Sequence, residues 1–288
     1  MRNLFVLPFD HRANFAQKLL GFSENPTPEE KAVVTNYKKI IYDAIWYAIE
    51  MGIPKSESAV LVDEVYGLEI LKDAKERGLV TMQTVEKSGR DEFEFEFGED
   101  DFREHLLAIM PTYAKALVRY DVNKDNSIQL ARLKKLSDFC RESDIQLLVE
   151  PLMQLRGEQS DFDHNRRYKD LILMMREMQA IGIEADVWKI EGLYEKYQYE
   201  EVVRQARNTR EREHVSIIIL GRNETKEHVM QWIEAGRDVE GVAGFAVGRT
   251  IFWHPLIQFK EGKISREEAV KQIADDYFEY YKIFMKQI

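Results

Sequence analysis

The sequence predicts an α/β protein with the (β/α)8 TIM-barrel fold, and three observations support this. Short apolar runs alternate with longer helical patterns along all 288 residues. Most of these runs are apolar at every position, which is typical of parallel strands covered on both faces. The first run ends in FDHRANF and lacks the glycines that a doubly wound, dinucleotide-binding sheet places after its first strand. The closed barrel is therefore favoured over the open sheet, its main rival.

Eight strands are expected, each a short run rich in β-branched or other apolar residues. Their ranges are 3–10, 58–64, 80–86, 115–121, 145–151, 185–191, 215–221 and 244–249. Because parallel strands need long crossover connections, a helix is expected between each strand and the next.

Helical patterns fill these intervals. The first, over 28–51, has the clearest ends, because Thr27 and Glu30 form a capping box around Pro28 and Gly52 follows the last turn. The others lie near 67–77, 99–110, 126–142, 163–181, 195–210, 224–236 and 265–286, with a short extra helix from Thr250. No linker-like or repetitive segment interrupts the pattern, so residues 1–288 are expected to form a single domain.

Composition narrows the class of protein. The net charge of −10 argues against a general nucleic-acid binder, although a local basic pocket for a small anion is allowed. Cys140 is the single cysteine, so neither an intramolecular disulfide nor a multi-cysteine metal site is expected. The sequence lacks a signal-like or membrane-spanning apolar stretch, so a cytoplasmic protein without membrane partners is expected. The oligomeric state stays open, with a homo-oligomer among the alternatives.

Charged residues gather at the predicted C-terminal ends of the strands. In a (β/α)8 barrel these ends share one face, where side chains converge on a common pocket. The residues are Asp10, His11, Arg12, Asp63, Glu64, Glu86, Lys87, Arg119, Asp121, Glu150, Lys189, Glu191, Arg222 and Arg249. We expect the substrate site on this face, although a solvated loop would explain any one of these charges taken alone.

Lys189 stands out because it lies inside VWKIEG, between Trp188 and Ile190. Burial disfavours the charged ammonium, and nearby cations do the same. Alternation along the fourth strand places Lys115 and Arg119 on one face, where they would supply such cations. An amine kept neutral in this way forms imines. The alternative reading is an ion pair between Lys189 and Glu150 or Glu191.

Glu150 ends the apolar run IQLLVE and precedes Pro151, which is expected to fix the chain as it leaves the strand. A carboxyl group one strand away from Lys189 is placed for proton transfer to a carbinolamine or a leaving alkoxide. A purely ionic role remains the alternative.

A phosphate site is expected after the seventh and eighth strands. In barrels these loops, with a short extra helix, commonly hold phosphate through backbone N–H groups. The segment GFAVGRTIF supplies Gly248 and Arg249, and Gly221 supplies the contribution of the seventh strand. The glycines allow a ligand to approach the backbone closely.

Metal chemistry is a weaker alternative. The six histidines are scattered without HxH or HxxxH spacing, which argues against zinc. A magnesium site built from Asp10, Asp63 and Glu64 is left open. The sequence has no GxSxG elbow for serine catalysis. We therefore expect neither a metal nor another cofactor.

Six runs of the chain also carry a family resemblance. They are LVDEVYG (61–67), TVEKSGRDE (84–92), YAKALVRYDVN (113–123), LLVEPL (147–152), ADVWKIE (185–191) and AVGRT (246–250). Together they resemble class I, Schiff-base aldolases of the tagatose-bisphosphate aldolase type. The chain is still more similar to the DUF2090 family, the aldolase-like domain fused behind the sugar kinase in many myo-inositol catabolism proteins.

The resemblance implies a Schiff-base lysine at Lys189 and a proton-shuttling glutamate at Glu150. It also implies a substrate-binding lysine at Lys115, which together with Asp10 would handle the hydroxyl protons. The residues expected to bind substrate or its phosphate are Arg249, Gly248, Gly221, Lys87, Arg119, Asp63 and Glu64. The implied activity is cleavage of a ketose phosphate, with 2-deoxy-5-keto-D-gluconate 6-phosphate favoured, to dihydroxyacetone phosphate and malonate semialdehyde. Two other functions remain open: a regulatory barrel that binds sugar phosphates without turnover, and a metal-dependent lyase or isomerase.

Overall fold

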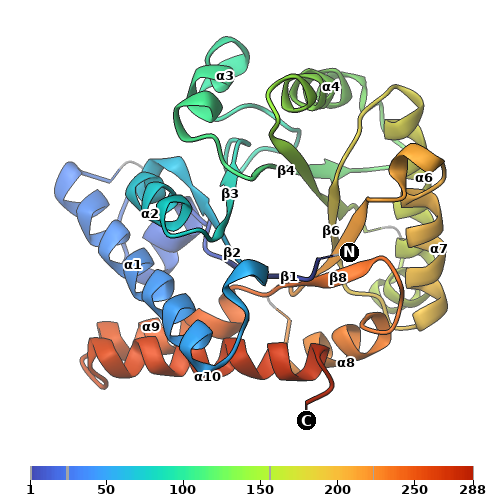
Figure 1. Cartoon of the computed structure of the whole chain (residues 1–288). Coiled ribbons are helices and arrows are strands. Elements are labelled where there is room, and N and C mark those ends of the chain that lie inside the picture. Colours follow the sequence, from blue (N-terminus) through green and yellow to red (C-terminus); the bar gives the residue numbers. More distant parts are fainter. Residues whose placement is uncertain (1, 24–25, 156, 223, 288) are drawn as a thin grey trace.

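The chain folds into a closed barrel, as a computed structural model of it shows (Figure 1). The structure describes residues 2–23, 26–155, 157–222 and 224–287. All eight predicted strands form, and each pairs in parallel with the next. Pairing of Val6 with Ala246 joins the first strand to the last and closes the barrel. The predicted (β/α)8 fold is confirmed, and the open doubly wound sheet is excluded.

The strands are short and almost entirely buried, as expected for a parallel barrel. They are β1 (Leu4–Pro8), β2 (Ser58–Asp63), β3 (Val80–Thr84), β4 (Tyr113–Tyr120), β5 (Gln146–Met153), β6 (Val187–Glu191), β7 (Ser216–Leu220) and β8 (Val242–Ala246).

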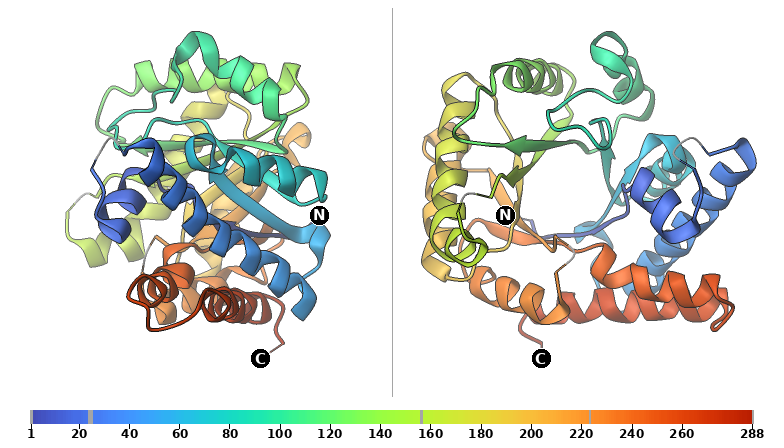
Figure 2. Two further views of the ribbon diagram at one scale, coloured as in Figure 1. Left: turned by 90° about the vertical axis from the view of Figure 1, so that its left-hand side faces the viewer. Right: turned by 180° about the vertical axis from the view of Figure 1, so that it is seen from behind.

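Helices surround the strands on all sides, as the views in Figure 2 also show. They are α1 (Pro28–Met51), α2 (Glu64–Glu76), α3 (Gly98–Ile109), α4 (Ser127–Glu142), α5 (Gln159–Asp161), α6 (Arg167–Ala180), α7 (Lys196–Ala206), α8 (Lys226–Gly236), α9 (Arg249–Lys260) and α10 (Arg266–Phe284). The capping box predicted for α1 is present, with Thr27 and Glu30 each accepting a hydrogen bond from the other's backbone. None of the helices described is long and apolar enough to cross a membrane.

Several predicted strand ends differ from the structure by two or three residues, and those of β5 and β8 bear on the site. We expected the fifth strand to end at Pro151, but β5 continues through this residue to Met153. The pairing of β5 with β6 stops at Val149. Pro151 lies beyond this pairing, so its lack of an N–H group costs no hydrogen bond to β6. β8 ends at Ala246, and Arg249 begins α9 instead of closing the strand.

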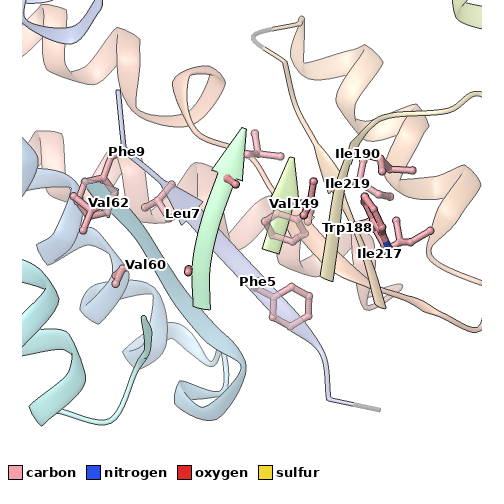
Figure 3. Close-up of a cluster of buried hydrophobic side chains, with 14 of the residues drawn as sticks. Phe5, Leu7, Phe9, Val60, Val62, Val149, Trp188, Ile190, Ile217 and Ile219 are labelled. Carbon is pink, nitrogen blue, oxygen red and sulfur yellow. The ribbon is translucent and has the colours of Figure 1, made fainter. Parts of the chain in front are cut away.

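The apolar core has two layers, one on each side of the strands. Residues such as Leu61, Met82 and Leu148 fill the inside of the barrel. The larger layer lies between the strands and the helices, and Figure 3 shows part of it around Phe5 and Trp188. Because successive side chains alternate across a strand, the positions that follow the inner layer toward the C-terminal ends also point inward. The charged residues described next occupy these positions.

Candidate active site

A cavity of about 360 Å³ lies at the C-terminal ends of the strands. Its lining includes eight basic side chains, Arg12, Lys87, Arg90, Lys115, Arg119, Lys189, Arg222 and Arg249, and four acidic ones, Asp10, Glu86, Glu92 and Glu150. The lining therefore carries four more basic than acidic groups, although the whole chain has a net charge of −10. Such a local excess of positive charge suits an anionic small molecule.

Lys115 on β4 lies at the centre of a cluster of buried charges. Its Nζ is 2.9 Å from Asp10 Oδ2, 2.5 Å from Glu86 Oε1 and 2.8 Å from Glu150 Oε2. Burial works to lower the pKa of Lys115, but the three carboxylates together raise it well above its ordinary value. Lys115 is therefore held as an ammonium ion.

Glu150 also contacts Lys189, so it joins the two lysines. Its Oε2 lies 2.9 Å from Lys189 Nζ, and both side chains are almost fully buried. Burial tends to raise the pKa of Glu150, but Lys115 and Lys189 outweigh it, and the pKa is lowered. Glu150 is thus a carboxylate in the free protein. Of the two ion pairs considered for Lys189, the structure forms the one with Glu150.

Asp10 and Glu86 share Lys115, but their surroundings drive their pKa values apart. Burial tends to raise the pKa of Asp10, yet Lys115 and Lys189 bring it well below its ordinary value. Thr84 also donates a hydrogen bond of 3.1 Å to Asp10 Oδ2. For Glu86 burial prevails, and its pKa is raised. Its Oε2 is buried and has no hydrogen-bond partner among the residues described.

The rim of the cavity carries basic residues on opposite sides of the barrel. Lys87 and Arg90 follow β3, and the Nε of Arg119 on β4 donates a hydrogen bond of 3.2 Å to the Arg90 carbonyl. Arg222 follows β7, and Arg249 begins the helix after β8. Strands three and four lie across an eight-stranded barrel from strands seven and eight. An elongated ligand with two anionic ends would therefore match the rim.

Gly248, Gly221 and Arg249, the residues predicted to bind phosphate, all line the cavity. The requirement for glycine at 248 has a different cause from the one we expected. A Cβ at this position would lie 2.4 Å from the Pro8 carbonyl oxygen, so a side chain would push β1 and β8 apart. Gly248 precedes α9 without a side-chain cap. The first N–H groups of this helix therefore remain available to an anion.

Comparison with known protein families identifies the chain. Residues 1–287 match the family described as an uncharacterized protein conserved in bacteria, DUF2090. The chain belongs to the DUF2090 family. The resemblance read from its sequence motifs is thereby confirmed. A search of curated proteins found no significant match.

Solved structures similar to this DUF2090 protein share its barrel. One is fructose-bisphosphate aldolase from Plasmodium falciparum, solved in complex with TRAP and a small-molecule inhibitor. It is 11% identical, with a TM-score of 0.69, and the match covers 99% of this chain and 91% of the aldolase. Another is Cgl0159 from Corynebacterium glutamicum, 15% identical with a TM-score of 0.60, matched over 99% of this chain and 86% of that one. At these identities the similarity establishes the barrel fold alone.

Asp63 and Glu64 were expected to contact substrate, but the structure places neither in the lining of the cavity. Asp63 forms a buried ion pair with Lys38 and accepts a hydrogen bond from the Tyr66 N–H, which caps α2. Glu64 begins that helix and contacts His105 Nδ1 at 2.7 Å. Both carboxylates are therefore occupied in holding α2 in place.

The magnesium alternative required Asp63 and Glu64 to converge with Asp10, and they do not. Asp10 belongs to the lysine cluster, whereas Asp63 pairs with Lys38. Across the described ranges, no group of three or more His, Cys, Asp or Glu side chains is arranged to hold a metal ion.

Sequence reasoning in the DUF2090 chain missed several charged or titratable cavity residues: His11, Arg12, Glu86, Arg90, Glu92 and Arg222. His11, Arg12, Glu86 and Arg222 appeared among the strand-end charges, but nothing distinguished them from solvated loop residues. Alternation along β3 could have placed Glu86 inward, two residues beyond Thr84. Arg12 connects two loops, because it donates a 2.5 Å hydrogen bond to the Glu86 carbonyl and pairs with Glu96.

Proposed function

We propose that this protein is a class I aldolase that cleaves a ketose phosphate through an imine on Lys189. The observation that carries the proposal is the contact of 2.9 Å between Lys189 Nζ and Glu150 Oε2, inside a cavity rich in basic groups. A buried lysine paired with a carboxylate has the two groups that imine formation needs: a nucleophilic nitrogen and a partner that moves protons.

Lys189 is a better candidate for the nucleophile than Lys115. Three carboxylates hold Lys115 as an ammonium ion, whereas Lys189 lies against one of them, Glu150. Releasing the proton of Lys189 therefore forfeits fewer ion pairs. In this proposal Lys115 stays charged and stabilises negative charge that develops on a substrate oxygen.

The chemistry follows from these protonation states. Glu150 accepts a proton from Lys189, whose nitrogen then attacks the keto carbon and forms a carbinolamine. Glu150 returns the proton to the carbinolamine hydroxyl, which leaves as water and gives the iminium. A base removes the proton of the hydroxyl on the carbon that will become the aldehyde, and the bond between this carbon and its neighbour on the imine side breaks. Its electron pair moves into the iminium to give an enamine and an aldehyde. Asp10, a carboxylate beside Lys115, is the base we assign.

The substrate we favour is 2-deoxy-5-keto-D-gluconate 6-phosphate, which would yield dihydroxyacetone phosphate and malonate semialdehyde in myo-inositol catabolism. Support comes from the family resemblance and from the charges of the cavity. A molecule with a phosphate at one end and a carboxylate at the other suits the two basic sides of the rim. Arg249, Gly248 and Gly221 would hold the phosphate, while Lys87 and Arg119 lie across the barrel. The similar barrel from Plasmodium falciparum is a fructose-bisphosphate aldolase, which is in keeping with this proposal.

Borohydride reduction in the presence of dihydroxyacetone phosphate tests this proposal. We expect one reduced adduct per chain, located on Lys189 by peptide mapping, and no adduct in Lys189→Met. Lys115→Arg is the matched control and should keep the adduct on Lys189. An adduct on Lys115 or Lys87 would contradict the assignment. Binding without adduct or cleavage would instead favour a regulatory barrel.

A further inference from the structure

His11 occupies a place in the cavity that the proposed mechanism does not use. It follows β1 and lines the cavity together with Gly248 and Arg249. Its ring packs edge-on against Phe252 in the first turns of α9, with 6.0 Å between the ring centroids. Its Nδ1 is buried and has no hydrogen-bond partner among the residues described. The imidazole thus stands beside the N-terminus of α9 with hydrogen-bonding capacity unused.

The ring is uncharged in the free protein. Burial lowers the pKa of His11 to about 4. The charged groups that act on it are Asp10, which raises this pKa, and Arg249, Lys38 and Lys189, which lower it. They come from the β1 end itself, α9, α1 and β6, so the cations surround the imidazole from three different elements. A dianion bound among them would offset the charge of these cations and so favour the protonated ring of His11.

Arg249 supplies a second sign of an anion site. Burial lowers the pKa of its guanidinium, which shows that its charge is poorly solvated. Within the described ranges, Arg249 forms no ion pair with a carboxylate. Together with the free N–H groups of α9, it offers charge and hydrogen bonds that lack a partner.

We propose that His11 is part of the anion subsite formed by Arg249 and the N-terminus of α9, and that it takes up a proton from solvent when a dianion binds there. The inference rests on the proposed function in that this subsite would receive the substrate phosphate. Protonation gives both ring nitrogens a hydrogen to donate. The imidazolium can therefore donate a charge-assisted hydrogen bond to the anion, whereas a neutral ring has one donor and no charge. By linkage, a dianion that favours protonated His11 must bind more tightly as the pH falls.

Sulfate is the probe for this coupling, because it stays dianionic between pH 5 and 7.5 and exchanges no proton itself. We expect its affinity for the wild-type protein to rise about tenfold from pH 7.5 to pH 5. Burial also raises the pKa of Glu86, whose protonation would add to the effect. The measured quantity is therefore the difference between wild type and His11→Asn, obtained by calorimetry in two buffers of different ionisation enthalpy. The exposed His254→Asn on the same helix is the matched control and should behave as wild type.

NMR provides a reading that does not depend on the folding of a variant. The imidazole signal of His11 should move toward its protonated position when sulfate is added to wild-type protein at pH 5.5. Absence of sulfate binding, equal pH dependence in wild type and His11→Asn, or an unmoved His11 signal would each overturn the inference. The proposed function fails separately, if no adduct forms on Lys189 with dihydroxyacetone phosphate while sulfate still binds with proton uptake.

Discussion

Lys189 Nζ lies 2.9 Å from Glu150 Oε2, and the same carboxylate oxygen lies 2.8 Å from Lys115 Nζ. One buried oxygen is therefore shared by two cationic groups with different surroundings. Lys115 has two further carboxylates, from Asp10 and Glu86. This asymmetry gives the lysines separate roles in the proposal: one is fixed as a cation, and the other exchanges its proton with Glu150.

Replacing Glu150 with glutamine should separate catalysis from binding. The amide keeps the size of the side chain but cannot carry the proton between Lys189 and the carbinolamine. We expect turnover of a ketose phosphate to fall by at least about 10². Imine formation should become slow without being abolished, since Lys189 remains, and circular dichroism should show an intact fold. Full activity in Glu150→Gln would show that another group carries the proton.

Removing the charge of Lys115 should destabilise the fold. In Lys115→Met, three carboxylates lose their common partner inside the barrel, and breaking a buried ion pair costs about 3–5 kcal/mol. Denaturant unfolding at pH 7 should show a fall of that order in the free energy of unfolding. The exposed Lys124→Met after β4 is the control and should stay within about 0.5 kcal/mol of wild type.

The pH dependence of this loss has a definite sign. The pKa values of Asp10 and Glu150 are lowered in the folded protein, so the stability they contribute is present above their ordinary values of 3.8 and 4.5. It is lost as the pH falls through the lower folded-state values. The deficit of Lys115→Met relative to wild type should therefore shrink in acid. A deficit that grows below pH 4 would contradict the assigned charges.

Arg249→Ala should weaken phosphate binding. The substitution removes a charge-assisted contact, so the affinity for dihydroxyacetone phosphate should fall by about 1.5–3 kcal/mol. Isothermal titration calorimetry measures this directly. Arg176→Ala, an exposed change on α6 away from the cavity, serves as the control. Equal affinities of wild type and Arg249→Ala would remove Arg249 from the anion site.

Activity should survive exhaustive treatment with EDTA, because the proposed mechanism uses the Lys189 iminium as its electron sink. Retained turnover after gel filtration into chelator-treated buffer is the expected result. Turnover that is lost and then restored by zinc or magnesium would place the protein among metal-dependent lyases or isomerases.

The period of the sequence pattern predicted which side chains of a strand point into the barrel. Alternation on β4 placed Lys115 and Arg119 on the face that lines the cavity, and the order of the strands placed Glu150 beside Lys189. These relationships depend on local pattern and strand order, which the sequence contains. The roles of these residues in catalysis stay predictions.

Partners brought together from distant segments could not be read in the same way. Asp63 faces Lys38, which α1 supplies 25 residues earlier, and so it stabilises a helix end and does not reach the cavity. His11 packs against Phe252 in α9, which lies more than 200 residues later in the chain. Such contacts depend on how helices pack against the barrel, and no spacing rule within one segment specifies them.

Glu86 gives the last prediction, because its pKa is shifted in the opposite direction from the pKa values of Asp10 and Glu150. Burial raises the pKa of Glu86 above its ordinary value of 4.5, so its contribution to stability is present at low pH and is lost as the pH rises through the folded-state value. Glu86→Gln keeps a neutral hydrogen-bonding side chain near Lys115 and cannot ionise. The free energy of unfolding of the wild type, relative to Glu86→Gln, should therefore decrease between pH 5 and pH 8. Urea titrations of both proteins at several pH values measure the difference. Glu94→Gln, a more exposed change on the same loop, should give a flat difference. A relative stability of wild type that increases with pH would show that Lys115 keeps Glu86 ionised and that burial is the weaker influence.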